Sequence, residues 1–231
     1  MVDPSGTDQA RQALERLLAP SGIASLGVIR EDGRSWGTGA RRAIPLTGAG
    51  MASVDHDERE APFVAGPDGM PDDTWLVSLT DEGELRLCAW AHLEGPTRVR
   101  GIGVDLASTG DFAGERGARF NRLLFTGSEL AWAEGRIAED PLELSLAYAF
   151  SAKEAAFKSL AARLRSWYRT HAEKLVFDLR DFELAGDRHE AGSARRGAAA
   201  SAMDRMGIAC IELGRTSLCG LALTFAVALG R

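Results

Sequence analysis

Cysteine and histidine are scarce in this chain, and they form no cluster. The three cysteines, Cys88, Cys210 and Cys219, are too few and too scattered for a disulfide framework or a zinc site. Each lies in an apolar run, which predicts a buried, reduced thiol. Positive charge is also in deficit, since the net charge is −6. This balance argues against a general nucleic-acid-binding protein. We therefore expect no nucleic-acid partner.

Long apolar runs are missing as well. The longest, residues 218–229, is too short to span a bilayer, so we expect no membrane segment. The first ten residues are polar and carry Asp3 and Asp8, which is not the pattern of a signal peptide. We expect a cytoplasmic protein. Glycine-rich nucleotide loops are also absent, since Gly101-Ile102-Gly103 is not followed by the glycine-rich helix start of a dinucleotide site.

The sequence does contain alternating helical and strand-like patterns in its first half. Apolar spacing predicts a helix over 9–18 and a strand over 23–29. Residues 36–73 are interrupted by glycine and proline and give no clear pattern. A β-hairpin is predicted over 74–90, with its turn at Asp81-Glu82-Gly83.

The second half begins with a strand predicted over 99–104. The remaining expected elements are helices over 118–124, 128–134 and 145–168, strands over 174–178 and 182–184, a mobile polar loop over 187–200, and a closing hairpin of 208–213 with 217–229. Each half ends in a hairpin with a cysteine in its second strand. This likeness predicts two related halves, residues 1–98 and 99–231.

The clearest chemical signal is Ser151-Ala152-Lys153-Glu154-Ala155-Ala156-Phe157-Lys158, read together with Asp105. Glu154 and Lys158 are four residues apart, so they lie on one face of a helix. Asp105 ends an apolar strand and is expected to enter a loop from which it can reach the same place. Two carboxylates and a lysine suit Mg²⁺ that bridges phosphate oxygens. The alternatives are an ordinary ion pair on a solvated helix and an aspartate that caps a turn.

Taken in order, Gly103-Val104-Asp105, Arg119-Phe120, Phe125-Thr126-Gly127-Ser128-Glu129 and Phe150-Ser151-Ala152-Lys153-Glu154 with Lys158 resemble the 4'-phosphopantetheinyl transferases. The resemblance covers about residues 66–158. It implies an α+β fold of two pseudo-symmetric halves, each a small antiparallel sheet packed with a long helix. The halves resemble the surfactin-activating type, which implies a monomer with the coenzyme between the halves.

The resemblance also implies the reaction. Such an enzyme transfers the phosphopantetheine arm of coenzyme A to a serine of an acyl or peptidyl carrier protein, with Mg²⁺. It makes Asp105 and Glu154 the metal ligands, and it makes Lys158 a catalytic residue that contacts a phosphate oxygen and stabilises the leaving group. Lys153 is implied to neutralise the pyrophosphate, with a surface salt bridge as the alternative. Glu154 is the implied proton acceptor, and Glu129 is the second candidate, its alternative being a charge at a helix N-terminus.

The chain departs from the family pattern at its metal motif, in residues 99–231, and in its coenzyme-binding half, residues 1–98. The surfactin-activating type has Asp-x-Glu after the strand, whereas here Ala107 replaces the second acid. Asp81 occupies the place of a phosphate-binding histidine, although Thr80 beside it keeps a hydroxyl. The glycine-rich loop at 66–71 lacks its lysine. The implied coenzyme contacts are Gly103, Thr80, Asp81, Lys153, Lys158, Arg41 and Arg42.

A basic stretch follows the predicted catalytic helix. Arg163, Arg165, Arg169 and Lys174 alternate with Trp167 and Tyr168. The pattern fits either a solvated helix face or a docking surface for an acidic carrier protein. Two functions from different classes therefore remain open. One is a Mg²⁺-dependent phosphopantetheinyl transferase. The other is a non-catalytic homologue that binds coenzyme A or a carrier protein as a regulatory module.

Overall fold

The structure, a computed structural model, describes residues 4–18, 23–32, 42–46, 50–56, 61–137, 140–185, 192–195 and 197–231. In the first part of the chain the elements are α1 (Pro4–Leu18), β1 (Ile23–Asp32), β2 (Arg42–Leu46), β3 (Gly50–His56), β4 (Pro62–Val64), β5 (Trp75–Glu82) and β6 (Leu85–Leu93). They are followed by β7 (Val99–Ala107), the 3-10 helix η2 (Thr109–Phe112), α2 (Gly114–Leu124), α3 (Gly127–Gly135), α4 (Leu142–Ser159), α5 (Ala161–Thr170), the 3-10 helix η3 (Leu179–Asp181), β8 (Phe182–Ala185), β9 (Gly192–Arg195), α6 (Gly197–Arg205), β10 (Ile208–Leu218) and β11 (Leu221–Gly230).

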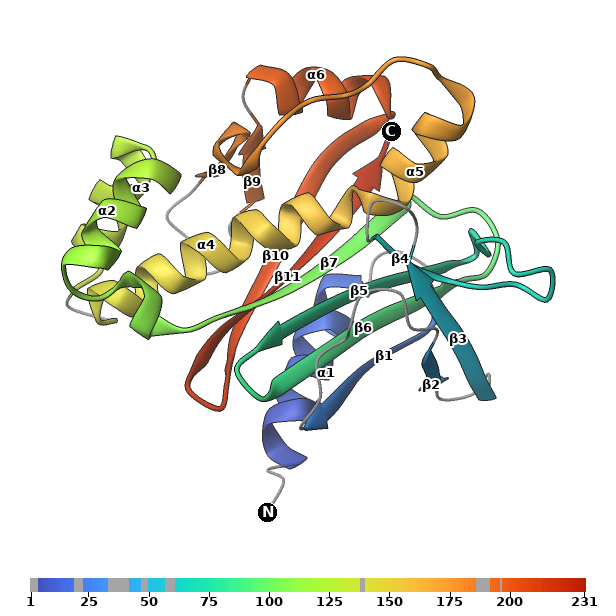
Figure 1. The fold of residues 1–231 in the computed structure, drawn as a ribbon, viewed down its shortest axis with the longest axis horizontal. Helices are drawn as coiled ribbons and strands as arrows, with labels where there is room; N and C mark the ends of the chain where they lie inside the picture. Colours follow the sequence, from blue (N-terminus) through green and yellow to red (C-terminus); the bar gives the residue numbers. More distant parts are fainter. Residues whose placement is uncertain are drawn as a thin grey trace.

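Two antiparallel sheets of three strands have the same order. In the sheet β1-β6-β5, the central strand is β6, which comes last in the chain and pairs with both β1 and β5. The sheet β7-β11-β10 repeats this order in the second half (Figure 1). The α+β fold class expected from the sequence is thus confirmed. The division of the chain between residues 98 and 99 stays a prediction.

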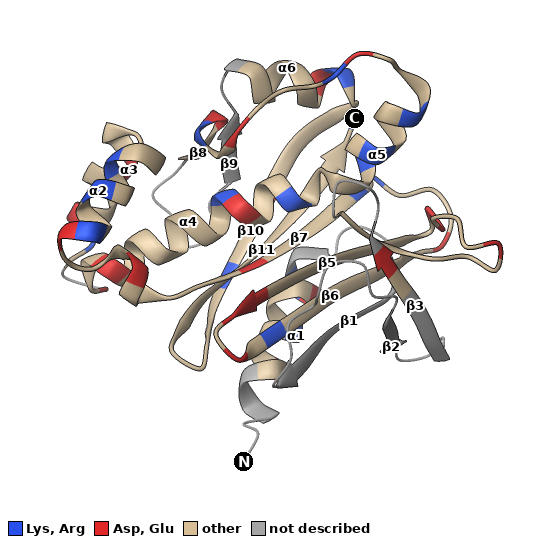
Figure 2. Cartoon of the chain, in the orientation of Figure 1, with Lys and Arg blue, Asp and Glu red and all other residues tan. Residues whose placement is uncertain are grey.

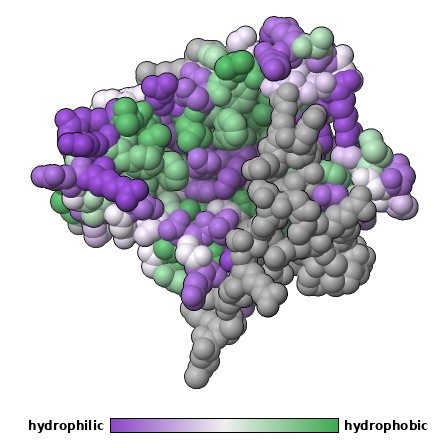
Figure 3. Space-filling view, viewed as in Figure 1, coloured by the Kyte–Doolittle hydropathy of each residue, from purple (hydrophilic) through white to green (hydrophobic). Residues whose placement is uncertain are grey.

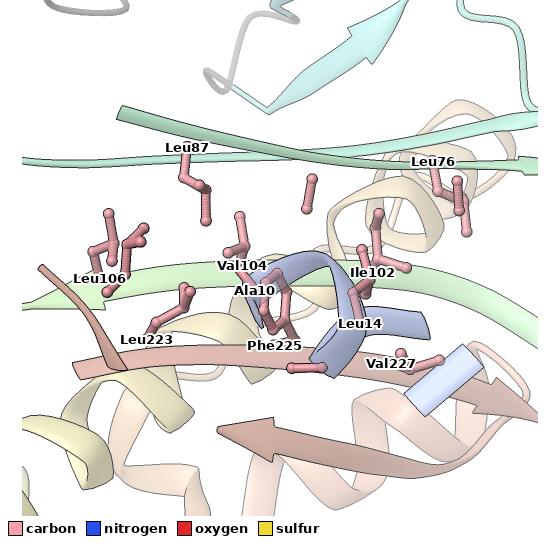
Figure 4. Close-up of a cluster of buried hydrophobic side chains, with 14 of the residues drawn as sticks. Ala10, Leu14, Leu76, Leu87, Ile102, Val104, Leu106, Leu223, Phe225 and Val227 are labelled. Carbon is pink, nitrogen blue, oxygen red and sulfur yellow. The ribbon is translucent and has the colours of Figure 1, made fainter. Parts of the chain in front are cut away.

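The main hydrophobic core lies between these two sheets and α1. Leu76 and Leu87 of the first sheet face Val104 of β7 and Phe225 of β11, and Leu14 of α1 joins the same cluster (Figure 4). The even-numbered residues of β5 therefore point toward the second sheet, because side chains alternate along a strand. This packing brings β5 and β7 side by side.

Helix α4 covers the other face of β7 and β11, and two glycines make its close approach possible (Figure 1). A Cβ atom on Gly101 would lie 1.8 Å from the carbonyl oxygen of Ser159. A Cβ atom on Gly103 would lie 1.9 Å from the carbonyl oxygen of Ala155. Any side chain at either position would push α4 away from the strand. The glycines thus set the distance between β7 and the helix that carries Glu154.

The structure corrects two element boundaries near the predicted site. Strand β7 continues to Ala107, so Asp105 lies inside the strand, paired with Thr224 of β11, and not at a loop entrance. The predicted helix over 145–168 is two helices, because Leu160 is fully buried and its N–H bonds to the carbonyl of Phe157, three residues back. This tighter turn ends α4 and changes the direction of the chain.

Three further expectations were wrong. Residues 174–178 form no strand; the hydroxyl of Tyr168 donates to the Leu175 carbonyl instead, which holds the segment against α5. Within 187–200, predicted as a mobile loop, lie β9 and the start of α6, where Ala199 is buried. Strand β10 extends to Leu218, since Cys219 and Gly220, with φ of 53° and 81°, make the tight turn.

Two smaller findings complete the comparison. Cys88 is buried as expected, whereas Cys210 and Cys219 are exposed, so the prediction for these two thiols was wrong. The unreadable region 36–73 contains β2, β3 and β4, which form a third sheet. Among the residues that the structure describes, no helix is both long enough and apolar enough to cross a membrane.

Candidate active site

Asp105 is the centre of a buried polar cluster between the two halves. Its side chain sits on β7, and only 5% of the residue is exposed. The Lys158 ammonium lies 2.6 Å from Oδ1, and the Thr80 hydroxyl donates to the same oxygen at 3.1 Å. Burial raises the pKa of Asp105, and the neighbouring Lys158 lowers it again in part. The aspartate is therefore a buried acid whose charge depends on a cation beside it.

Strand β5 supports this cluster through side chains and not through a backbone ladder. The Val104 amide donates to the Ser78 hydroxyl at 3.0 Å, and the Leu106 amide donates to the Thr80 hydroxyl at 3.2 Å. All these groups are buried. Because buried amides require acceptors, Ser78 and Thr80 fix the position of β7 on both sides of Asp105.

Helix α4 presents three polar groups to Asp105 on one face. Ser151, Glu154 and Lys158 are separated by three and four residues. The Ser151 hydroxyl donates to the Asp105 carbonyl oxygen at 2.7 Å. Glu154 is half-buried, and burial followed by the charge of Asp105 raises its pKa, while Lys158 lowers it. A basic and an acidic position lie next to each other in the middle of α4, and a further basic position follows toward α5 (Figure 2).

The donor set at this place fits a hard divalent cation. Oδ2 of Asp105 is buried and makes no hydrogen bond to the described part of the chain. Such an orphaned carboxylate oxygen is costly unless a cation neutralises it. Two carboxylates and hydroxyl oxygens match Mg²⁺, which keeps several waters and needs only one or two protein carboxylates. Within the described ranges, no three His, Cys, Asp or Glu side chains are close enough together to hold an ion by themselves.

The surface over this region is hydrophilic. In Figure 3 a band of hydrophilic atoms lies near the middle of α4 and the strands beside it, with hydrophobic atoms on either side. This face of the protein therefore has a polar strip bordered by apolar surface.

Glu129 and Lys153 form a separate buried pair. Their charged groups are 2.9 Å apart, and each side chain is 1% exposed. Glu129 also completes a capping box with Thr126 at the start of α3 and accepts from the Leu184 amide at 3.2 Å. Lys153 donates to the Leu124 carbonyl oxygen. The structure therefore does not bring these two residues to the Asp105 cluster. Lys153 forms a buried ion pair, in place of the surface pair that was the alternative.

The other predicted coenzyme contacts are scattered. Gly103 is buried against α4, so packing already requires a glycine there. Thr80 belongs to the Asp105 cluster. Asp81 is exposed and, by strand alternation, lies on the opposite face of β5 from Thr80. Arg41 lies outside the described residues; Arg42 is in β2, with its side chain outside the description.

Ala107, where the family pattern has a second acid, is packed among apolar side chains. It is 3% exposed and shares a cluster with Phe112, Phe125 and Leu146. A carboxylate at this position would lose its hydration shell among these apolar side chains, which costs free energy. The alanine is thus matched to its surroundings.

The basic stretch on α5 lies near the opposite end of β7. Arg163 and Arg165 line a cavity of about 310 Å³, together with Arg100, Trp75 and Asp73. Burial and the charge of Arg100 lower the pKa of Arg163. The cavity is distinct from the Asp105 cluster, because Arg100 and Asp105 are five residues apart along an extended strand.

Sequence reasoning missed Ser78 and Ser151 as members of the cluster. A signal for each was present in the sequence. Ser78 and Thr80 alternate with apolar residues in β5, which marks one polar strip on a buried strand. Ser151 precedes Glu154 by three residues on the helix face that carries Lys158. What the sequence did not reveal is that these two strips face each other.

Comparison with known families gives a match to a segment that includes Asp105, Glu154 and Lys158. Residues 101–207 match the family described as the 4'-phosphopantetheinyl transferase superfamily. A search of curated proteins gives no significant match.

Several solved structures are similar over part of the chain. One is a holo-ACP-synthase from Plasmodium yoelii, 23% identical, with 58% of this chain and 96% of that one covered and a TM-score of 0.45. Another is the holo-[acyl-carrier-protein] synthase of Neisseria meningitidis, 24% identical, covering 56% and 98%, with a TM-score of 0.40. A third is an ACPS-CoA complex from Chronobacterium ammoniagenes, 21% identical, covering 56% and 96%, with a TM-score of 0.43.

Proposed function

We propose that this chain, of which residues 101–207 match the 4'-phosphopantetheinyl transferase superfamily, transfers the phosphopantetheine arm of coenzyme A to a serine of an apo carrier protein. The observation that carries the proposal is the constellation of the buried Asp105 with the half-buried Glu154 and Lys158. It lies within the matched segment and combines two acids of raised pKa with a lysine. Such a set suits a reaction at a pyrophosphate.

Asp105 and Glu154 are the residues that would hold Mg²⁺. The ion, when bound, would neutralise charge on the pyrophosphate oxygens and so stabilise the transition state. The orphaned Oδ2 of Asp105 and the neighbouring Glu154 support this role. Lys158, now 2.6 Å from Asp105 and 29% exposed in its side chain, is near enough to the surface to turn toward a substrate phosphate.

In the proposed step, the serine hydroxyl oxygen attacks the phosphorus that bears the pantetheine arm. A new oxygen–phosphorus bond forms, the bond to the nucleotide phosphate breaks, and 3',5'-ADP leaves. The serine proton passes to a carboxylate of the enzyme. Glu154 is favoured as acceptor because its raised pKa makes it a better base, whereas both oxygens of Glu129 are already engaged with Lys153, Thr126 and Leu184.

The partner is proposed to be an acidic acyl or peptidyl carrier protein. The arginines of α5 support electrostatic docking, since all described residues of that helix are at least partly exposed. The shared order of the two sheets supports a monomer in which residues 1–98 and 99–231 form two similar halves. Monomeric state and cytoplasmic location remain predictions from the sequence.

The decisive test is to incubate the protein with coenzyme A, Mg²⁺ and several apo carrier proteins, and to weigh the carriers by mass spectrometry. We expect one or more carriers to gain the arm. Asp105→Asn and Glu154→Gln should each slow transfer by at least about a hundredfold. Glu84→Gln is the matched control, because Glu84 is exposed at the tip of the β5–β6 hairpin. Carriers that bind but gain no mass would favour a non-catalytic homologue.

A further inference from the structure

The hydrogen bonds between β5 and β7 fix which residues meet along the two strands. Ser78 meets Val104, and Thr80 meets Leu106, so both strands advance by two residues in the same direction. One further step of two leads along β5 to Glu82, its last residue, and along β7 just past its last residue, Ala107. Side chains two apart share a strand face. Glu82 therefore points to the same side as Thr80, which contacts Asp105 directly.

The charged neighbours of Glu82 are acidic, and no basic side chain of the described residues forms an ion pair with it. The residue is half-buried, and its carboxylate makes no hydrogen bond or ion pair with the described part of the chain. Burial and the charges of Asp111, Asp105 and Asp81, in that order, raise its pKa. Such a group is unfavourable in the isolated protein. A bound divalent cation would reverse the sign of the local field.

Independent support comes from Asp105 itself. Its Oδ2 atom is buried without a hydrogen bond in the described residues, and the aspartate as a whole is 5% exposed. The residue two further along β7, Ala107, is enclosed by apolar side chains and offers no oxygen. Glu82, which is close enough for the charge of Asp105 to raise its pKa, offers a further carboxylate from the neighbouring strand β5.

We propose that Glu82 is a positioning residue of the divalent-cation site formed by Asp105 and Glu154, where it accepts hydrogen bonds from water in the cation's hydration shell. The inference rests on the proposed function for the identity of the cation. The role is proposed to act through water and not by direct ligation, because the described residues contain no group of three His, Cys, Asp or Glu side chains that could hold an ion directly. Mg²⁺ commonly retains such waters.

The test is a titration of each protein with Mn²⁺, followed by the electron paramagnetic resonance signal of the free ion. This readout needs no carrier protein and no turnover. Glu82→Gln should weaken Mn²⁺ binding about tenfold, the usual effect of losing a group that orients a metal site from outside its direct ligands. Asp81→Asn is the matched control: it removes a neighbouring charge from the opposite face of β5 and should leave the affinity within about twofold.

The outcomes separate this inference from the proposed function. Equal Mn²⁺ affinity in wild type and Glu82→Gln, with binding lost in Asp105→Asn, would overturn the role of Glu82 and leave the metal site intact. Equal weakening by Glu82→Gln and Asp81→Asn would also overturn it, since general surface charge would then explain both. Absence of Mn²⁺ binding in the wild type would instead remove the cation site itself. Circular dichroism spectra check that each variant is folded.

Discussion

Replacing Lys153 with methionine tests whether this lysine supports the fold or contacts the coenzyme. The substitution keeps most of the side-chain volume and removes the ammonium. In the structure that ammonium is 2.9 Å from a Glu129 oxygen, with both side chains 1% exposed, and it donates to the Leu124 carbonyl oxygen. Lys153→Met therefore leaves a buried carboxylate and a carbonyl without their partner.

The expected cost follows from this burial. Breaking a buried ion pair by removing one partner destabilises a protein by about 3–5 kcal/mol. For a chain of 231 residues, this corresponds to a fall in Tm of roughly 10 °C. The double variant Lys153→Met/Glu129→Gln should be less destabilised than the sum of its single variants, because it leaves no unpaired charge. Urea unfolding followed by tryptophan fluorescence measures the free energies.

Lys174→Met provides the matched control, since Lys174 is exposed, and its effect should stay within about 0.5 kcal/mol. The reasoning is refuted if Lys153→Met unfolds at the same urea concentration as the wild type. If calorimetry then shows a large loss of coenzyme A affinity, Lys153 serves the ligand and the ion pair with Glu129 is incidental.

Three other outcomes follow from the geometry. Gly103→Ala should cost about 1–3 kcal/mol and slow transfer, because its Cβ would meet the backbone of α4, whereas Gly127→Ala, with open space around it, should be neutral by thermal unfolding. Burial and the charge of Asp105 raise the pKa of Glu154, so its ionisation disfavours folding as the pH rises above the ordinary value of 4.5. Without added metal, Glu154→Gln should therefore have a higher Tm than the wild type near neutral pH, and the difference should vanish below pH 4.5; a constant difference would contradict this. Thr80→Val should cost about 1–3 kcal/mol in urea unfolding, since it leaves the buried Leu106 amide without an acceptor, and Thr80→Ser should recover most of it.

Local sequence was sufficient for the parts of the site that lie on one element. The spacing of Glu154 and Lys158 determines a shared helix face, whatever the rest of the fold does. The hairpin of β5 and β6 was also predictable, because Gly83 and the charged residues beside it interrupt two apolar runs. These features depend on neighbours in the chain and need no tertiary information.

Contacts between distant segments were not predictable in the same way. Residues 174–178 have a strand-like pattern but find no partner strand, so they remain irregular. The hydrogen bonds from Val104 and Leu106 to β5 join residues 26 positions apart and appear only once both sheets are packed. The isolation of Lys153 from Glu154, its neighbour in sequence, likewise depends on the position of α3.

The location of the candidate site explains why the two halves depend on each other. Asp105 is held by Thr80 from the first half and by Lys158 and Ser151 from the second. Gly101 and Gly103 allow α4 to approach one face of β7 closely. The face of β5 that carries its even-numbered residues packs against the other face of β7. A shift of either sheet would alter the distance between the two acids, Asp105 and Glu154. Since the proposed divalent cation would need well-defined ligand positions, packing in the core between the sheets would determine whether these two acids can hold it.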